Sequence, residues 1–228
     1  MRSTQTYKTL FSGLAVSLTA LMAPSAMAEI VSQPTTVVEL FSSQGCSSCP
    51  PANAQVVELD HSMPDVLALT YGVTYWDYLG WTDTFGDKAF TQRQRAYDMA
   101  INSGVYTPML VVDGASHGSR LSDAKLASSD VPQTVSLFRQ SGELCIDSDV
   151  PVGSKLAVVH YKPGEHSVSV SRGENGGRTL TLANVVTDID YKDWTGTPIC
   201  GLHAMKAMAV LAHDSETAAI IGAARIEP

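Results

Sequence analysis

The sequence is poor in basic residues, and those present form no cluster. Lys and Arg together number 15, against 23 Asp and Glu, and the formal net charge at pH 7 is −8. Nucleic acids and anionic membranes are bound through concentrated positive charge, so neither is expected as a partner. The chain also lacks a glycine-rich phosphate loop, a nucleophile elbow and a zinc-protease helix motif, which argues against the enzyme classes that depend on them.

Long hydrophobic runs are also missing after residue 28, so no membrane span is expected in that part of the chain. At the N-terminus, Arg2 and Lys8 accompany an apolar stretch over residues 10–22. Ala26-Met27-Ala28 then has the small-residue pattern of a cleavage site. Residues 1–28 therefore predict a signal peptide cleaved near Ala28, with an uncleaved anchor as the alternative. The mature protein is expected to be periplasmic or secreted.

Cysteine is scarce, but its number is even: the chain has four, at Cys46, Cys49, Cys145 and Cys200. In an exported chain, an even number suggests two disulfides, and four cysteines allow three connectivities. We expect Cys46–Cys49 together with Cys145–Cys200. The second bridge would close a long loop, which is where a structural disulfide stabilises most.

The Cys46-Ser47-Ser48-Cys49 motif lies where a predicted strand, residues 36–41, runs into a predicted helix, residues 52–59. Two thiols at such a junction can close a small disulfide ring, and a helix N-terminus favours the thiolate needed for exchange. Cys49 precedes Pro50, however, and a residue before proline avoids the α region. We therefore expect the helix to begin near Pro51, with less help from its dipole for Cys46.

The first half of the chain alternates strands and helices. Further strands are expected at residues 66–71 and 109–112, a helix at 89–102 closed by Gly104, and a short helix at 121–128. Asp113-Gly114 signals a hairpin. The order strand, CxxC, helix, strand, helix, Thr-Pro, hairpin is that of a thioredoxin fold. We accordingly expect Thr107–Pro108 to be a cis peptide facing the two cysteines, against an ordinary trans proline as the alternative.

From about residue 131 the pattern changes to short strands separated by turn residues, which suggests an antiparallel sandwich. The turns are expected at residues 141–142, 162–164 and 173–177. Strands are expected at residues 134–139, 143–147, 156–161, 167–172, 179–186, 205–213 and 218–226. The last two are rich in alanine, so helices are the alternative there. The predicted organisation is a thioredoxin-like domain at 29–131 and a β-sandwich-like domain at 132–228.

Several motifs resemble those of a secreted, thioredoxin-like family of unknown function, the domain-of-unknown-function 1223 family. The matching segments are 45–51 (GCSSCPP), 75–81 (YWDYLGW), Thr91 with Arg93-Gln94, 106–108 (YTP) and 173–180 (GENGGRTL). The resemblance covers nearly the whole mature chain. It implies the fold, and it implies no established activity.

Two positions depart from that family's pattern. Gly72-Val73-Thr74 stands where members commonly have His-Val-Asp, and Met109 stands where Gln is usual. If the His or Asp moves protons for the thiols, this chain lacks that helper.

Three functional hypotheses follow. The first is an exported thiol–disulfide oxidoreductase that acts on protein thiols or disulfides without a cofactor. In it Cys46, the more exposed thiol, attacks, Cys49 resolves, and a substrate groove is formed by Thr107, Pro108, Trp76 and Trp81. The second is a non-catalytic binding module with a static disulfide. The third is copper bound by the CxxC and a histidine, although the six histidines form no ligand-spaced pair, so no metal site is predicted.

Overall fold

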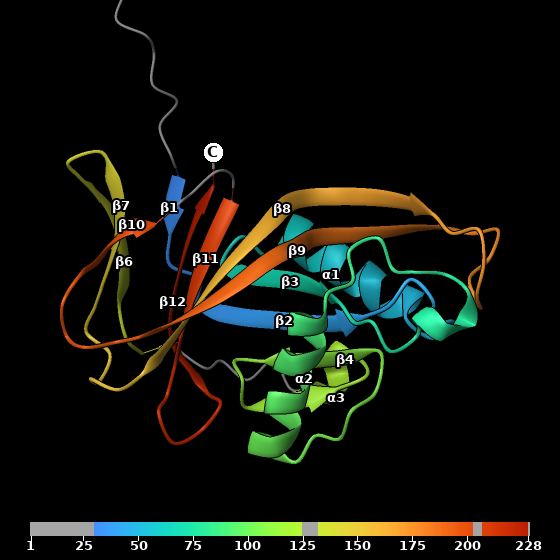
Figure 1. Ribbon diagram of the computed structural model, residues 1–228, viewed down its shortest axis with the longest axis horizontal. Coiled ribbons are helices and arrows are strands. Elements are labelled where there is room, and N and C mark those ends of the chain that lie inside the picture. Colours follow the sequence, from blue (N-terminus) through green and yellow to red (C-terminus); the bar gives the residue numbers. More distant parts are fainter. Residues whose placement is uncertain (1–29, 125–131, 203–206, 228) are drawn as a thin grey trace, which may run out of the picture.

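The computed structural model describes residues 30–124, 132–202 and 207–227, so the predicted signal peptide lies outside the described residues. Within these ranges the chain is a mixed α/β protein with one large and one small sheet (Figure 1). The large sheet has nine strands in the order β1-β12-β11-β8-β9-β3-β2-β4-β5, and the small one has three in the order β10-β7-β6. No helix in the described part is long and apolar enough to cross a membrane.

The first half of the chain builds one end of the large sheet, apart from its first strand, which pairs with the last strand of the chain at the opposite edge. Its elements are β1 (Ile30–Ser32), β2 (Thr36–Ser42), α1 (Pro50–Ser62), β3 (Val66–Gly72), η1 (Asp77–Leu79), α2 (Lys88–Ile101), β4 (Met109–Val112), β5 (Ser116–Gly118) and α3 (Leu121–Ala124). β2 is parallel to β3 and antiparallel to β4, and β4 and β5 form the predicted hairpin. The predicted strands and the second helix are confirmed. That helix ends at left-handed Asn102, not at Gly104.

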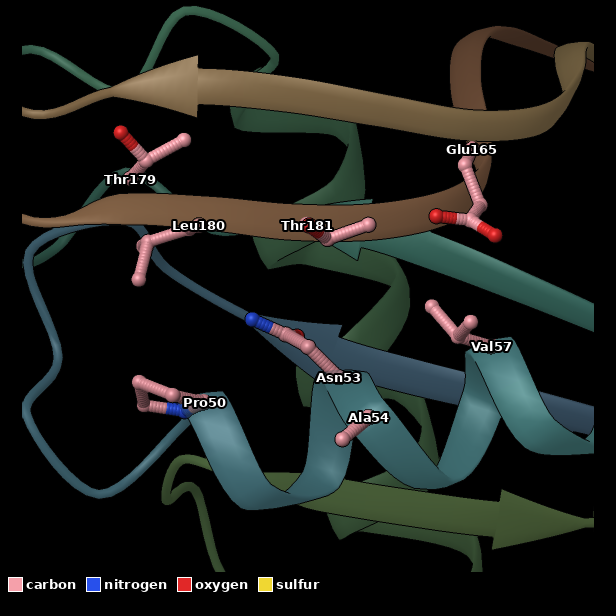
Figure 2. A pocket seen from close by; sticks show the side chains of 8 residues that line it. All are labelled: Pro50, Asn53, Ala54, Val57, Glu165, Thr179, Leu180 and Thr181. Atoms are coloured by element: carbon pink, nitrogen blue, oxygen red, sulfur yellow. The ribbon is translucent and has the colours of Figure 1, made fainter.

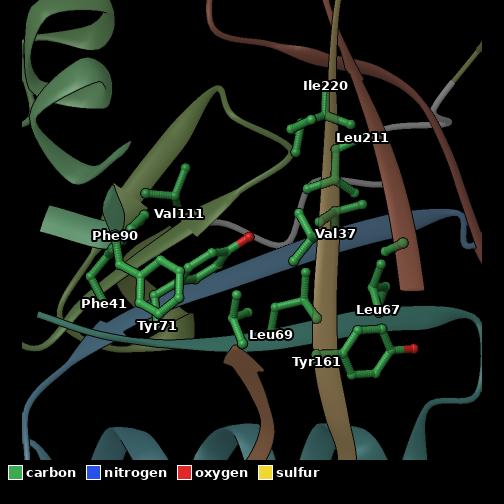
Figure 3. Close-up of a cluster of buried hydrophobic side chains, with 14 of the residues drawn as sticks. Val37, Phe41, Leu67, Leu69, Tyr71, Phe90, Val111, Tyr161, Leu211 and Ile220 are labelled. Atoms are coloured by element: carbon green, nitrogen blue, oxygen red, sulfur yellow. The ribbon is translucent and has the colours of Figure 1, made fainter. Parts of the chain in front are cut away.

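β2 and β3 are buried along their whole length because helices cover both faces of the sheet. On one face, Val38 and Leu40 pack with Val56 of α1. On the other face, Val37 and Phe41 pack with Phe90 of α2. Figure 3 shows how this second cluster continues to side chains of β8 and β11, so one core runs beneath both halves of the chain.

The second half extends the same sheet. Its elements are β6 (Val135–Gln140), β7 (Glu143–Ser148), β8 (Lys155–Ser169), β9 (Thr179–Asp193), β10 (Ile199–Leu202), β11 (Ala207–His213) and β12 (Ile220–Glu227). β11 and β12 are strands, as predicted. β9 pairs in parallel with β3 at Thr70 and Val185, and this pairing carries the sheet across the boundary expected near residue 131. The small sheet packs on one face through Val135, Leu137 and Ile146.

One predicted turn is wrong. Residues 162–164 were expected to separate two strands, but they lie inside the single strand β8. The pairing register with β9 shifts between Lys162 and Glu165, so one extra residue of β8 forms a bulge. The Gly164 N–H donates to Asn184 Oδ1 at 2.9 Å, and Gly164 has a φ of +72° that glycine adopts freely. A bulge tolerates Pro163, which has no N–H to give to a ladder.

The predicted bridge Cys145–Cys200 is confirmed and links β7 to β10, with Cα atoms 4.0 Å apart. We predict that replacing both cysteines with alanine lowers the free energy of unfolding by about 4 kcal/mol, because the bridge closes a 55-residue separation in the unfolded chain. Urea unfolding of the oxidised proteins measures the difference. A loss below about 1 kcal/mol would show that the bridge constrains little.

Candidate functional site

The CxxC motif lies between the end of β2 and the start of α1. α1 begins at Pro50, and Cys49 is its N-cap with φ −76° and ψ −33°. The expected start near Pro51 is therefore one residue late, and Cys49 is helical even though it precedes a proline. Its carbonyl accepts hydrogen bonds from Ala52 N–H at 3.0 Å and Asn53 N–H at 3.1 Å. Pro50 and Pro51 occupy the first turn, where backbone N–H groups have no acceptor within the helix, so the missing N–H of proline breaks no hydrogen bond.

Cys46 and Cys49 form the predicted disulfide, with Cα atoms 5.5 Å apart. Both residues are 0 % exposed, so the expectation that Cys46 is the exposed thiol is wrong. The Ser48 hydroxyl lies 3.3 Å from Cys46 Sγ. The pair lies at the N-terminus of α1, where the positive end of the helix dipole favours a thiolate. Both sulfur atoms are nevertheless shielded from solvent by the surrounding protein.

Thr107 and Pro108 lie beside the motif. Their peptide bond is cis, as predicted. Ser48 Oγ donates to the Thr107 carbonyl at 3.4 Å, which ties this turn to the CxxC loop. Trp76 Nε1–H donates to Thr107 Oγ1 at 2.7 Å. The structure thus brings Thr107, Pro108 and Trp76 together on one side of the disulfide.

Trp81 lies beside the segment that precedes the motif. Its Nε1–H donates to Gln44 Oε1 at 2.9 Å, two residues before Cys46. The Gln44 N–H donates to Asp83 Oδ2 at 2.8 Å. Burial raises the pKa of Asp83 above its usual value, against the lowering effect of hydrogen bonds from the Gln44 and Phe85 N–H groups.

The loop between β8 and β9 covers the motif, a role that sequence reasoning missed. Asn175 is 0 % exposed, and its Nδ2 donates to the carbonyls of Gln44 at 3.0 Å and Cys46 at 2.8 Å. Glu174 Oε2 accepts from the Ser47 N–H at 3.1 Å. Hydrogen bonds from Ser47 lower the pKa of Glu174. Residues 173–177 do form the expected hairpin turn, and the turn is also hydrogen-bonded to the backbone of the CxxC loop.

Gly173 of this loop lies against Gly45 and Trp81. A Cβ on Gly173 would lie 3.9 Å from Gly45 Cα and 3.6 Å from Trp81 Cβ. A Cβ on Gly45 would lie 3.2 Å from Trp76 Cβ. The glycines of the two matching motifs, 45–51 and 173–180, therefore lie side by side. The signal for this contact in the sequence was that both motifs belong to the same family pattern.

The positions that depart from the family pattern hold no ionisable side chain. A Cβ on Gly72 would lie 2.7 Å from the Phe85 carbonyl oxygen, so backbone fills the space that a histidine would need. The Thr74 N–H donates a hydrogen bond to Thr91 Oγ1 at 3.1 Å, and Met109 Sδ accepts one from Gln94 Nε2 at 3.5 Å. Among the described residues, no three His, Cys, Asp or Glu side chains are grouped so that they could hold a metal.

The fold and the site define an α/β protein with a disulfide at a strand–helix junction, covered by a distant hairpin. The chain belongs to the family described as "Protein of unknown function (DUF1223)", whose family model matches residues 37–221. No curated protein matches the chain.

Two solved structures are similar. The crystal structure of protein AGR_C_4864 from Agrobacterium tumefaciens is 31% identical, with a TM-score of 0.68 over 86% of this chain and 95% of that one. HBP35 of Porphyromonas gingivalis is 14% identical, with a TM-score of 0.54 over 85% of this chain and 74% of that one. At 14% identity, the second likeness concerns the fold alone.

Proposed function

We propose that this protein is an exported thiol–disulfide oxidoreductase that acts on protein thiols or disulfides through Cys46 and Cys49. The observation that carries the proposal is the position of the disulfide at the N-terminus of α1, with Ser48 joining it to Thr107 beside Pro108. The proposal includes export by cleavage of residues 1–28 and a periplasmic or secreted location.

A thioredoxin-like domain at residues 29–131 is part of the proposal. It is supported by the strand order β3-β2-β4-β5 and by α1 and α2 on opposite faces of those strands. For residues 132–228 we propose a sandwich-like domain, supported by the packing of Leu137 and Ile146 against Leu156 of β8 and Val210 of β11.

The exchange proceeds in two displacements. A substrate thiolate attacks Cys46 Sγ, a mixed disulfide forms, and the electron pair of the broken bond leaves on Cys49 as a thiolate. A second substrate thiolate then attacks the substrate sulfur, which releases an oxidised substrate and a Cys46 thiolate. The reverse sequence reduces a substrate disulfide, with Cys49 resolving the mixed disulfide. The positive end of the α1 dipole stabilises the thiolate in both directions.

We predict that the variant Cys49→Ala accumulates mixed disulfides between Cys46 and its protein partners, because the resolving thiol is gone. Expression in the exporting compartment followed by non-reducing electrophoresis detects the adducts. Cys46→Ala is the matched control and should trap none. Absence of adducts with Cys49→Ala, together with a disulfide that mild reductants never open, would leave the catalytic proposal without support.

A non-catalytic binding module is the second candidate, and complete burial of both cysteines favours it. In that case the loop over the disulfide is part of a static structure. The reduction potential of Cys46–Cys49 separates the two candidates: a value below about −300 mV indicates a structural bridge, and a less negative one supports exchange.

A further inference from the structure

A cleft of about 310 Å³ lies between α1 and β9 (Figure 2). One wall is a stripe of α1 residues spaced by a helical turn, and the other is the start of β9. The lining residues are Pro50, Asn53, Ala54, Val57, Glu165, Thr179, Leu180 and Thr181. Pro50 directly follows Cys49, and Thr179 follows the loop at residues 173–177, so the lining of the cleft begins one residue from the candidate site.

The floor of the cleft holds a buried amide with unused hydrogen-bonding capacity. Asn53 is 2 % exposed, and its Oδ1 accepts from Ser42 Oγ at 2.9 Å. Its Nδ2 has no hydrogen-bond partner among the described residues. Figure 2 shows this nitrogen directed from α1 toward Leu180 and Thr181 of β9. An unsatisfied buried donor is unfavourable, and a carbonyl oxygen of a ligand would satisfy it.

The far end of the cleft carries negative charge. Glu165 lies there beside Val57 (Figure 2). Its carboxylate is 3.0 Å from His61 Nε2, and both side chains are about half exposed. A cationic group entering at this end would meet a carboxylate that solvent still reaches.

The length of the cleft matches a short peptide. From Pro50 to Val57 the helix rises by about 10 Å, at about 1.5 Å per residue. An extended chain covers that distance with about three residues, at about 3.3 Å each. Between the amide and the carboxylate the walls are mostly apolar, through Ala54, Val57 and Leu180.

We propose that this cleft binds an extended polypeptide segment that flanks the reactive cysteine of a protein substrate. A main-chain carbonyl accepts from Asn53 Nδ2, and a basic side chain about three residues from the cysteine lies at Glu165. The inference rests on the proposed function, and it narrows the substrate class to proteins with a basic residue near the exchanged cysteine.

The test uses two kinds of fluorescent peptide in which serine replaces the cysteine, so that binding is measured without exchange. One kind carries lysine and the other glutamate, and each is made in two versions, with that residue three positions before or three positions after the serine. Fluorescence anisotropy with the wild-type protein should show the lysine peptide binding about fivefold more tightly, the range of an exposed ion pair. Glu165→Gln should remove that preference.

Ala54→Phe fills the cleft and should weaken binding of the lysine peptide at least tenfold. Ala54 is exposed, so the larger side chain leaves the core intact. Glu58→Phe adds the same bulk to an exposed position of α1 outside the cleft and should change nothing. Equal affinity for the two peptides, or binding that Ala54→Phe leaves unchanged, overturns the proposal.

A second assay separates this inference from the proposed function. Reduction of Cys46–Cys49 by dithiothreitol needs no peptide cleft, so Ala54→Phe should leave its rate unchanged. If dithiothreitol never reduces the pair while the lysine peptide still binds as expected, the redox proposal fails and the cleft stands. If the pair is readily reduced but neither peptide binds, the cleft fails and the redox proposal stands.

Discussion

Replacing Asn175 with alanine should speed the reduction of Cys46–Cys49 by dithiothreitol roughly thirtyfold, because it removes two buried hydrogen bonds worth about 1 kcal/mol each. Asn175 Nδ2 holds the carbonyls of Gln44 and Cys46, and its Oδ1 accepts from Arg178 at 3.0 Å. Both cysteines are completely buried, so a reductant reaches them only after the structure around them opens, and we expect this loop to be the part that opens. Each kilocalorie removed from the cost of opening raises the open population about fivefold.

Asn184→Gly is the matched control. Asn184 is also a buried asparagine of the second half, and its Nδ2 donates to Asp60 Oδ1 at 2.7 Å and to the Ala68 carbonyl at 3.0 Å. It has a φ of +49°, which glycine accepts without strain. Its loss should lower overall stability without speeding reduction. If the two variants are reduced equally fast, global unfolding and not the loop controls access.

Replacing Arg93 with methionine should destabilise the protein by about 4 kcal/mol at neutral pH, the usual cost of stranding one charge of a buried pair. Arg93 Nε and Nη2 donate to the two oxygens of Glu39 at 2.7 and 2.9 Å, and both side chains are nearly inaccessible. Arg93 Nη2 also donates to Tyr97 Oη at 3.1 Å, and the Tyr97 hydroxyl donates to Glu39. Urea unfolding at pH 7 measures the loss.

The pH dependence of that variant gives a second readout. Burial by itself raises the pKa of Glu39, but the charge and hydrogen bonds of Arg93 outweigh it and hold the pKa below its usual value. Without Arg93, burial raises the pKa of Glu39 in the folded state above that in the unfolded chain. Stability is then greatest below the unfolded pKa and falls as the pH rises through the folded one.

The double variant Glu39→Leu with Arg93→Met controls for lost packing. It buries no unpaired charge, so it should be clearly more stable at pH 7 than Arg93→Met alone. Equal stability of the two variants would show that the cost comes from packing and not from a stranded carboxylate.

The thiol site shows which structural features the local sequence predicts. The residue types of β2, β3 and α2 predict their positions because apolar runs and helical spacing act over a few residues. The pairing of the cysteines followed from their number and spacing, and the cis peptide from the order of elements. The start of α1 was missed by one residue, because hydrogen bonds to the Cys49 carbonyl outweigh the local bias of a residue before proline.

The cover over the disulfide needed the folded chain. Asn175 and Cys46 are 129 residues apart, and no local propensity specifies a contact over that separation. The same holds for Glu39 and Arg93, which lie 54 residues apart. Glu39 lies in a predicted strand, and only the packing of α2 on β2 supplies its partner.

By itself, the sequence determined the alternation of strands and helices and the strand–CxxC–helix junction, because short-range spacing and residue type govern them. The even number of cysteines and the short CxxC spacing favoured one of three possible pairings, and the folded chain confirmed it by bringing Cys145 and Cys200 together across 55 residues. Tertiary structure alone decided that β8 passes unbroken through Pro163, that β9 joins both halves in one sheet, and that the loop after β8 closes over Cys46 and Cys49. These features depend on long-range strand pairing and on buried polar groups finding partners, and both are satisfied only when distant segments pack together.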